Sequence, residues 1–569
     1  MYSNKENVNI LTALLLEHGV RHAVVCPGSR NAPIVHNLNE CPEIACHPVT
    51  DERSAGFYAL GMTQCLHEPV AVCVTSGTAL LNLLPAVAEA YYQQRRLVVI
   101  SADRPAAWID QLDGQTLPQP DALGRFVRKA VSLPEIHTDE DRWYCNRLVN
   151  EALIQLHGPV HINVPISEPL FDFTVDELPE QRKIEYHEPD ISATMLRHIG
   201  QMFMIAKRPM LISGQPMNPL MDEAVLQIGD DERYVPDFVL YTGSAIVSKR
   251  LKRFLRKAKE TWVVNAFGEV TDTFMNMTHV FQGDAEVVAD YIRFMQEEQP
   301  HPFVQMWDEL LSAIRQRVDA FVPAYSQMAA VKYLEEHVSR EAMHYANSSA
   351  IRLANTYAHH PVFCNRGVNG IEGSLSTAAG FSVVTDEQVV CVIGDLSFFY
   401  DQNALWNQNL RGNLRILLLN NGKGGIFNML PGLEKSPARD RLVAARHSTT
   451  AEGICQQYHV GYRQAQDMDA MQQGIDWLLQ TDSEHPLLLE VLTDADIDAA
   501  VLHDFHCRWC PLSLGEGGGR GSLVFETRSS HELTYDAGGG YLLVADGDKV
   551  VDELQQTVGL LVLRAVLGY

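Results

Sequence analysis

An aspartate and an asparagine stand just beyond the ends of two apolar segments of this sequence. Asp395 comes after the apolar run at 389–393, and Asn421 comes after the run at 414–419. Both runs have the composition of buried parallel strands, and the residues at 400–410 between them predict a helix. A right-handed crossover of this kind brings the carboxyl ends of its two strands to the same edge of the sheet. We therefore expect the carboxylate and the amide oxygen to lie close together.

Such a pair of oxygen ligands has a chemical use. One carboxylate, one amide oxygen and a backbone carbonyl form half of a coordination shell for Mg²⁺, which keeps its other positions for water and phosphate oxygens. However, Gly-Asp after a strand and Asn-Asn at the start of a loop are also common turn sequences. Taken alone, the pair leaves a purely structural role open.

The elements that must position these residues recur along the chain. Short apolar runs alternate with helical patterns in three successive stretches, and the third includes predicted strands at 362–364 and 487–491. This alternation predicts parallel sheets covered by helices on both faces, with ligands beyond the carboxyl ends of the strands. The predicted fold class is α/β, with three consecutive domains and an atypical C-terminal tail. The expected boundaries are 1–175, 190–295, 330–505 and, for the tail, 506–569.

Composition excludes several classes of protein. The 569 residues include 45 Lys and Arg against 71 Asp and Glu, which gives a net charge of −26 and argues against a nucleic-acid partner. No apolar run approaches the roughly 20 residues that span a bilayer, and the N-terminal residues do not have the pattern of a signal peptide. The 11 cysteines are scattered singly, as in a reducing compartment. We expect a cytoplasmic protein with no membrane partner.

The sequence Gly-Asp-Leu-Ser at 394–397, followed by Asn-Asn at 420–421, resembles the motif of thiamine diphosphate enzymes. The resemblance implies that thiamine diphosphate binds with Mg²⁺ or Mn²⁺, held by Asp395, Asn421 and the carbonyl of Lys423. It also implies that Ile371 is the apolar wedge that bends the cofactor. The remaining residues implied to contact the cofactor are Gly394, Leu396, Ser397 and Ile426.

Glu52 is implied to be the activating acid of this family. It follows the predicted second strand in Asp51-Glu52-Arg53, at the start of a predicted helix. There its carboxyl group would protonate N1′ of the cofactor's aminopyrimidine ring. The alternative is that acidic residues in a first helical turn simply interact well with the helix dipole.

Further motifs recur in order across roughly residues 5–505. They are Pro-Gly-Ser-Arg at 27–30, Thr-Ser-Gly-Thr at 75–78, Ala-Asp-Arg-Pro at 102–105, Asn-Arg-Gly at 365–367 and Ile-Phe-x-x-Leu-Pro at 426–431. Together they resemble the 2-succinyl-5-enolpyruvyl-6-hydroxy-3-cyclohexene-1-carboxylate synthases, thiamine diphosphate enzymes of menaquinone biosynthesis. This resemblance implies decarboxylation of 2-oxoglutarate and 1,4-addition of the resulting carbanion to isochorismate. The central domain is shorter than is usual in the family.

Both implied substrates are dicarboxylates, for which arginine is the preferred partner. Ser29 and Arg30 are implied to be catalytic, and Ser348 and Arg352, four residues apart, are expected to share one helix face. Phe427 and Leu430 would form an apolar wall that keeps water from the carbanion. The other residues implied to bind substrate are Arg104, Gln115, Lys249, Arg250 and Arg366.

Active sites of this superfamily usually combine domains of different subunits. The resemblance therefore implies a homodimer or homotetramer with active sites at the subunit interface. Two other functions stay open. One is a different thiamine diphosphate decarboxylase or acetohydroxyacid-type ligase, which the six matching cations disfavour. The other is an inactive scaffold, which the intact Glu52, Asp395 and Asn421 disfavour.

Overall fold

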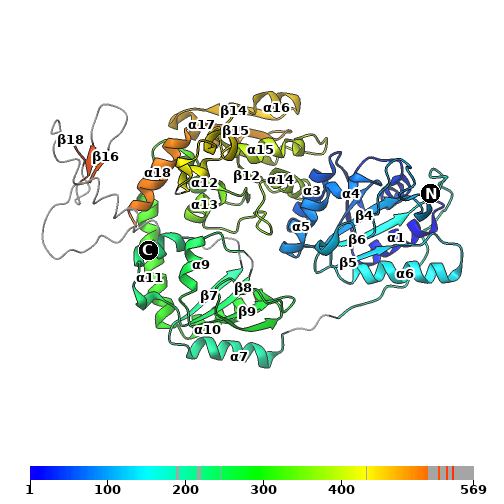
Figure 1. Cartoon of the computed structure of the whole chain (residues 1–569), viewed down its shortest axis with the longest axis horizontal. Coiled ribbons are helices and arrows are strands. Elements are labelled where there is room, and N and C mark those ends of the chain that lie inside the picture. The colour runs from blue at the N-terminus through cyan, green and yellow to red at the C-terminus, as the bar shows by residue number, and fades with distance from the viewer. Residues whose placement is uncertain are drawn as a thin grey trace. The chain divides into compact units, whose positions relative to one another are not determined.

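The computed structural model describes residues 1–187, 191–214, 219–243, 245–430 and 432–509, and three short strands in the tail (Figure 1). The chain divides into two units, Met1–Cys510 and Pro511–Tyr569. In the second unit, β16 (Leu523–Phe525), β17 (Leu533–Tyr535) and β18 (Tyr541–Leu543) pair in antiparallel fashion. Residues 506–509 of the predicted tail are described and lie in and just after a helix, α18 (Ala495–Cys507); the rest of the tail lies outside the described residues. No helix in the described part of the chain is both long and apolar enough to cross a membrane.

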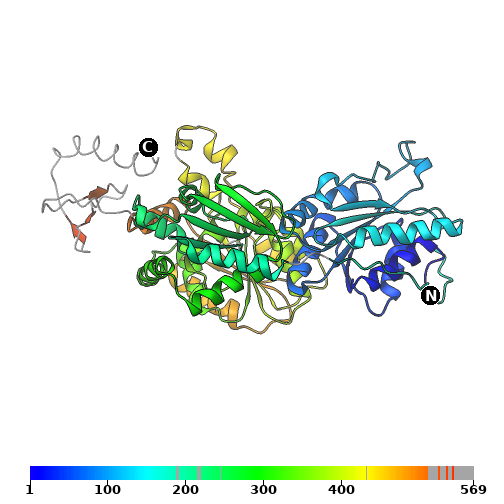
Figure 2. The same cartoon turned by 90° about the horizontal axis from the view of Figure 1, so that it is seen from below.

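The first sheet has six parallel strands in the order β2-β1-β3-β4-β6-β5. Its middle strands β3 and β4 are completely buried, as expected for apolar strands covered on both faces. Helices flank the sheet, among them α1 in dark blue and α6 in cyan (Figure 2). The strands are β1 (His22–Val25), β2 (Ala45–Pro48), β3 (Val70–Val74), β4 (Leu97–Asp103), β5 (Lys129–Ser132) and β6 (Val160–Pro165). The helices are α1 (Glu6–Glu17), α2 (Ala32–Glu40), α3 (Glu52–Leu66), α4 (Thr78–Asn82), α5 (Leu84–Gln93) and α6 (Asp139–Leu153).

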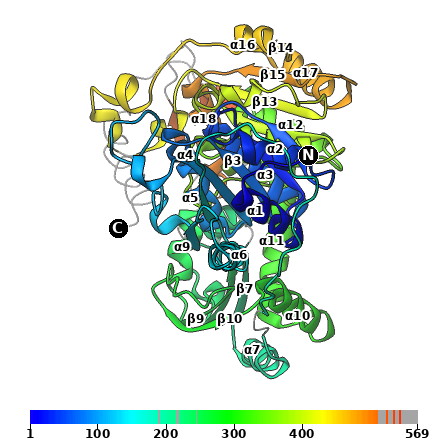
Figure 3. The same ribbon diagram turned by 90° about the vertical axis from the view of Figure 1, so that its right-hand side faces the viewer.

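The second sheet has four parallel strands in the order β10-β9-β8-β7. Figure 3 shows β7, β9 and β10 with α7 and α10 beside them. The elements are α7 (Ala193–Ile205), β7 (Pro209–Gly214), α8 (Met221–Ile228), β8 (Phe238–Gly243), α9 (Lys249–Leu255), β9 (Glu260–Asn265), β10 (Met277–Gln282) and α10 (Ala285–Glu298).

The third sheet has five parallel strands in the order β11-β12-β13-β15-β14. Its strands are β11 (Ala342–Tyr345), β12 (Val389–Gly394), β13 (Leu414–Asn420), β14 (Gly461–Ala465) and β15 (Leu487–Leu492). The helices that precede and accompany it are α11 (Pro302–Ala320), α12 (Gln327–His337), α13 (Ser349–Tyr357), α14 (Ser374–Val383), α15 (Asp395–Tyr400), α16 (Glu452–Gln457), α17 (Met468–Gln480) and α18 (Ala495–Cys507).

Three parallel sheets confirm the predicted α/β class, whereas the domain boundaries stay a prediction. Two local predictions are wrong. The helix expected at 400–410 begins earlier, at Asp395, and ends at Tyr400. The next residue, Asp401, is completely buried and accepts hydrogen bonds from the Ser376 amide and hydroxyl groups, which hold the chain in a turn. The strand expected at 362–364 is reduced to a single bridge between His344 and Phe363.

Two glycines bring the first and third sheets' helices into backbone contact. A Cβ atom on Gly61 of α3 would lie 1.9 Å from the Thr377 carbonyl oxygen of α14. A Cβ atom on Gly380 of α14 would lie 2.2 Å from the Tyr58 carbonyl oxygen of α3. No larger residue fits either place without separating the helices. This crossing fixes how α3 lies on the domain built around the third sheet.

The crossing predicts that Gly380→Ala destabilises the protein. The added methyl group meets rigid backbone, so we expect a loss of about 1–3 kcal/mol, the usual cost of overpacking. The matched control is Gly453→Ala in α16, where an added Cβ meets nothing within 4 Å and should raise helix stability by up to about 1 kcal/mol. Thermal unfolding of the two variants measures the difference. Equal melting temperatures would contradict the α3–α14 contact.

Candidate active site

Asp395 is buried at the junction of β12 and α15. Its Oδ1 atom accepts a hydrogen bond from the Leu396 amide at 2.7 Å, and its Oδ2 atom accepts from the amides of Asn421 at 3.2 Å and Gly422 at 2.8 Å. The Nε2 atom of His447 lies 3.3 Å from Oδ2. Burial raises the pKa of Asp395, while these amides and His447 oppose the rise. The structure thus joins Asp395 to the loop that follows β13, as the strand spacing predicts.

The side chain of Asn421 is oriented by a second carboxylate. Its Nδ2 atom donates to Oδ2 of Asp498 at 3.0 Å, so its Oδ1 atom is the end that remains available. Neither this oxygen nor the carbonyl oxygen of Lys423 accepts a hydrogen bond from another described residue. The Lys423 ammonium group is directed to Asp496, 3.5 Å away. A carboxylate, a free amide oxygen and a free carbonyl oxygen are a donor set that suits Mg²⁺ or Mn²⁺.

Apolar side chains lie exposed near this loop. The carbonyl of Ile371 accepts a hydrogen bond from the hydroxyl of Ser397 in α15, yet the Ile371 side chain is 41% exposed. Ile426 and Phe427 lie half-buried in a 3₁₀ turn at Gly425–Met429, and Leu430 is 44% exposed. Side chains of this kind can pack against an apolar part of a ligand.

Glu52 is the first residue of α3, and its two neighbours hold it against the segment that follows β12. Oδ2 of Asp51 accepts a hydrogen bond from Asn403 at 2.7 Å. The Arg53 guanidinium donates to the Tyr400 carbonyl at 2.8 Å and also stacks over the Tyr400 ring. Glu52 itself is half-buried and makes no hydrogen bond or ion pair with another described residue. Its carboxyl group is therefore free to meet a ligand.

Cationic side chains gather beside α13. Arg366 donates to Oδ1 of Asn347 at 3.0 Å, and its Nε atom is buried without a partner. Burial and then the charge of Arg366 lower the pKa of Arg352. The same two causes, in the same order, lower the pKa of Lys252, with further contributions from Arg256 and Lys249. Arg352, Arg366 and Lys252 therefore form one positive cluster that an anion would stabilise.

Sequence reasoning missed Lys252 and misplaced Ser348. Lys252 follows Lys249 by three residues on α9, a spacing that places both on one helix face and could have identified it. Ser348 does not share a helix face with Arg352. It is the N-cap of α13 with a φ of 77°, and its carbonyl accepts a hydrogen bond from Arg352 at 2.5 Å. Arg250 lies 3.8 Å from Asp222.

The predicted residues of the first domain form a separate group. Arg30 is buried and donates to the Ile166 carbonyl at 2.8 Å and to Glu168 at 3.1 Å. Arg104 is paired with Asp113 at 2.9 Å. Ser29 and Gln115 are exposed, and Gln115 has a φ of 56°. Among the described residues, no hydrogen bond or ion pair joins Ser29, Arg30, Arg104 or Gln115 to the cluster beside α13.

Comparisons with known proteins identify the family of this chain. A family model described as the thiamine pyrophosphate enzyme, N-terminal TPP binding domain, matches residues 6–123. A protein of Bacteroides fragilis named 2-succinyl-5-enolpyruvyl-6-hydroxy-3-cyclohexene-1-carboxylate synthase is 44% identical over 554 residues, which span 89% of this chain and 99% of the relative. A protein of the same name from Bacteroides thetaiotaomicron is 43% identical over the same shares.

A more distant relative of the same name comes from Flavobacterium johnsoniae. It is 33% identical over 534 residues, or 86% of this chain and 96% of the relative. The chain therefore belongs to the 2-succinyl-5-enolpyruvyl-6-hydroxy-3-cyclohexene-1-carboxylate synthase family of thiamine diphosphate enzymes.

Proposed function

We propose that this chain catalyses the reaction after which its relatives are named. In that reaction 2-oxoglutarate loses CO₂ and its remaining four-carbon unit adds to isochorismate, a step of menaquinone biosynthesis. The observation that carries the proposal is the pairing of Asp395 with the Asn421 loop, while the neighbours of Glu52 dock on the same domain. This arrangement supports a thiamine diphosphate site with the diphosphate end at Asp395 and the aminopyrimidine end at Glu52.

Thiamine diphosphate, bound with Mg²⁺ or Mn²⁺, supplies the nucleophilic carbon and accepts the electrons released by decarboxylation. Asp395, the Oδ1 atom of Asn421 and the Lys423 carbonyl would hold the metal. Gly394, Leu396 and Ser397 would line the diphosphate. Ile371 and Ile426 would support the rings. The Glu52 carboxyl group would share its proton with N1′ of the aminopyrimidine ring.

Cationic side chains would bind the carboxylates of the two substrates. Arg352, Arg366, Lys249 and Arg250, with Ser348 beside them, would bind one set of substrate carboxylates. Arg30, Arg104 and Gln115 would bind another, and Ser29 would act with Arg30 at the reacting carbon. Phe427 and Leu430 would exclude water and so protect the carbanionic centre from protonation.

We also propose a homodimer or homotetramer in which each active site combines two chains. Residues 166–187 contain no helix, and their only strand-like contact is the bridge between Tyr2 and Val175. Hydrogen bonds hold the chain on the first domain as far as Ile184, whose amide donates to Asn150. Only residues 185–192 then link it to α7, a reach of about 26–29 Å at 3.3–3.6 Å per residue. Exposed apolar side chains near the α3–α14 contact support such packing, namely Tyr92, Val368, Ile371, Tyr400 and Trp406.

The state of the cysteines supports a cytoplasmic location. No disulfide joins those in the described part of the chain, as in a reducing compartment.

The substrate assignment predicts CO₂ release from 2-oxoglutarate that depends on isochorismate. The purified chain is supplied with thiamine diphosphate and Mg²⁺, and the adduct is identified by mass spectrometry. We expect a chelator to stop the reaction, since the oxygen ligands at Asp395 require a cation. Turnover of pyruvate in place of 2-oxoglutarate would favour the other ligases. Cofactor binding without turnover of either substrate would indicate an inactive scaffold.

The role of Glu52 predicts that Glu52→Gln lowers kcat by about 100-fold or more, the usual contribution of a positioned acid or base. Cofactor and metal affinity should change little, because other residues hold the diphosphate. The matched control is Glu140→Gln, an exposed acid in the first turn of α6. If both variants keep full activity, Glu52 serves only the helix dipole.

The shared site predicts that two inactive variants restore each other. Glu52→Gln and Asp395→Ala chains are co-expressed with different tags. If each site takes Glu52 from one chain and Asp395 from the other, mixed dimers contain one intact site. Random pairing then restores about a quarter of wild-type activity. Mixed dimers without activity would show that each site lies within one chain.

A further inference from the structure

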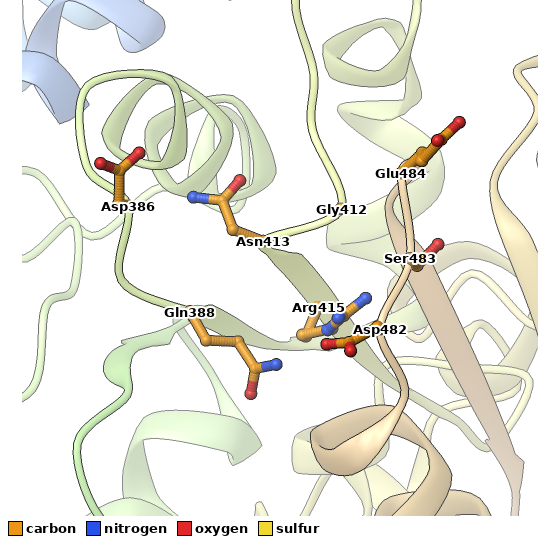
Figure 4. Close-up of a pocket in the computed structure, with 8 residues that line it drawn as sticks. All are labelled: Asp386, Gln388, Gly412, Asn413, Arg415, Asp482, Ser483 and Glu484. Atoms are coloured by element: carbon orange, nitrogen blue, oxygen red, sulfur yellow. The ribbon is translucent and has the colours of Figure 1, made fainter.

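A hollow lies at the opposite end of the third sheet from Asp395. Its volume is roughly 470 Å³, and Figure 4 shows the side chains around it. Gln388 and Asn413 stand just before β12 and β13, and Ser483 lies in the loop before β15. The hollow therefore opens at the amino ends of these strands, whereas Asp395 and Asn421 lie at the carboxyl ends. It is not part of the active site.

The most informative side chain in this hollow is Arg415. It is only 3% exposed, and its Nη2 atom donates to the Thr481 carbonyl at 2.7 Å. Its Nε and Nη1 atoms are buried without a hydrogen-bond partner. Leaving buried donors unpaired costs on the order of 1–3 kcal/mol each, and more for a charged group. A guest that offers acceptor oxygens, such as a carboxylate, would remove this cost.

Asn413 adds a second requirement, because its amide oxygen has no hydrogen-bond donor. Its Nδ2 atom donates to the carbonyls of Ser382, Thr385 and Glu387 at 2.9, 3.0 and 3.1 Å, which fixes the orientation of the amide. Its Oδ1 atom is buried and accepts nothing. Asn413 and Arg415 are two residues apart in an extended chain, so their side chains lie on the same face. The guest must therefore present a donor beside its acceptor.

Acidic side chains at the rim of the hollow favour a donor group that carries a positive charge. Asp482 and Glu484 are exposed beside the hollow and make no ion pair with another described residue, whereas Asp386 is paired with Arg411 at 2.9 Å. The charge of Asp482 also acts on Arg415, whose pKa it raises against the effect of burial. The two rim carboxylates together attract a cation and repel a dianion such as phosphate. The wall is also firm, because a Cβ atom on Gly412 would lie 1.5 Å from the Ser483 carbonyl oxygen.

We propose that this hollow binds a small zwitterion of the α-amino acid class. The carboxylate would accept hydrogen bonds from Arg415. The ammonium group would donate to Oδ1 of Asn413 and face Asp482 and Glu484. The side chain of the amino acid would extend into the remaining volume toward Gln388.

The proposal is tested by ligand-observed NMR on the full chain loaded with thiamine diphosphate and Mg²⁺. The probes are the twenty common L-amino acids, with acetate and ethylamine as the two separate halves of the zwitterion. We expect at least one amino acid to bind about tenfold or more tightly than either half, because both ends are recognised together. If no amino acid binds, water alone fills the hollow and the proposal is wrong. Equal binding of acetate would overturn it as well.

Variants of the lining residues test whether the amino acid binds in this hollow. Arg415→Gln should abolish it, but this change also removes the bond to Thr481 and could unfold the domain. Asp482→Asn changes only an exposed side chain and should weaken amino-acid affinity several-fold without changing basal activity. The matched control is Asp469→Asn, an exposed aspartate of α17, which should bind like the wild type. Unchanged affinity in Asp482→Asn would place the amino acid elsewhere.

Discussion

The pairing of β12 with β13 is the constraint on which the rest of the site depends. Its register places Gly394 opposite Leu419, so the Asp395 carboxylate meets the backbone amides that follow β13. A buried carboxylate must be compensated by hydrogen bonds or a cation, and here backbone amides supply part of that compensation. The loop is held from its other side by Glu490, which is completely buried and accepts hydrogen bonds from Asn420, the Ala451 amide and Tyr462. The proposed metal ligands therefore lie on a rigid support.

The glycine crossing of α3 and α14 extends this support to Glu52, the acid proposed for the other end of the cofactor site. Gly61 and Gly380 allow backbone contact, and the hydroxyl of Tyr58 donates to the Ala404 carbonyl at 2.7 Å. The start of α3 is thereby tied to the segment that leads out of α15. In the proposed dimer the same contact would form between two chains.

Much of this arrangement could be predicted from the sequence, because buried parallel strands have continuous apolar runs and their ends are marked by polar turns. Edge strands were harder to predict from the sequence. In β14, Arg463 and Gln464 are exposed, so its pattern does not resemble a buried strand, and β11 has only four residues. The start of α15 at Asp395 was also missed, since the helix begins at the residue directly after the end of the strand at Gly394. Asp498 could not be found at all, because 77 residues separate it from Asn421 and no local pattern links them.

The cations show why a strongly acidic chain can still hold dicarboxylates. Burial and then the charge of Arg366 lower the pKa of both Arg352 and Lys252, so repulsion from Arg366 is already present before any anion arrives. An incoming carboxylate relieves that repulsion, whereas cations that are already neutralised, such as Arg104 beside Asp113, must first give up a partner. The cluster beside α13 is therefore the part of the site that is preorganised for an anion. In the proposed function, substrate affinity would arise there, and the first-domain residues would contribute orientation once their own ion pairs rearrange.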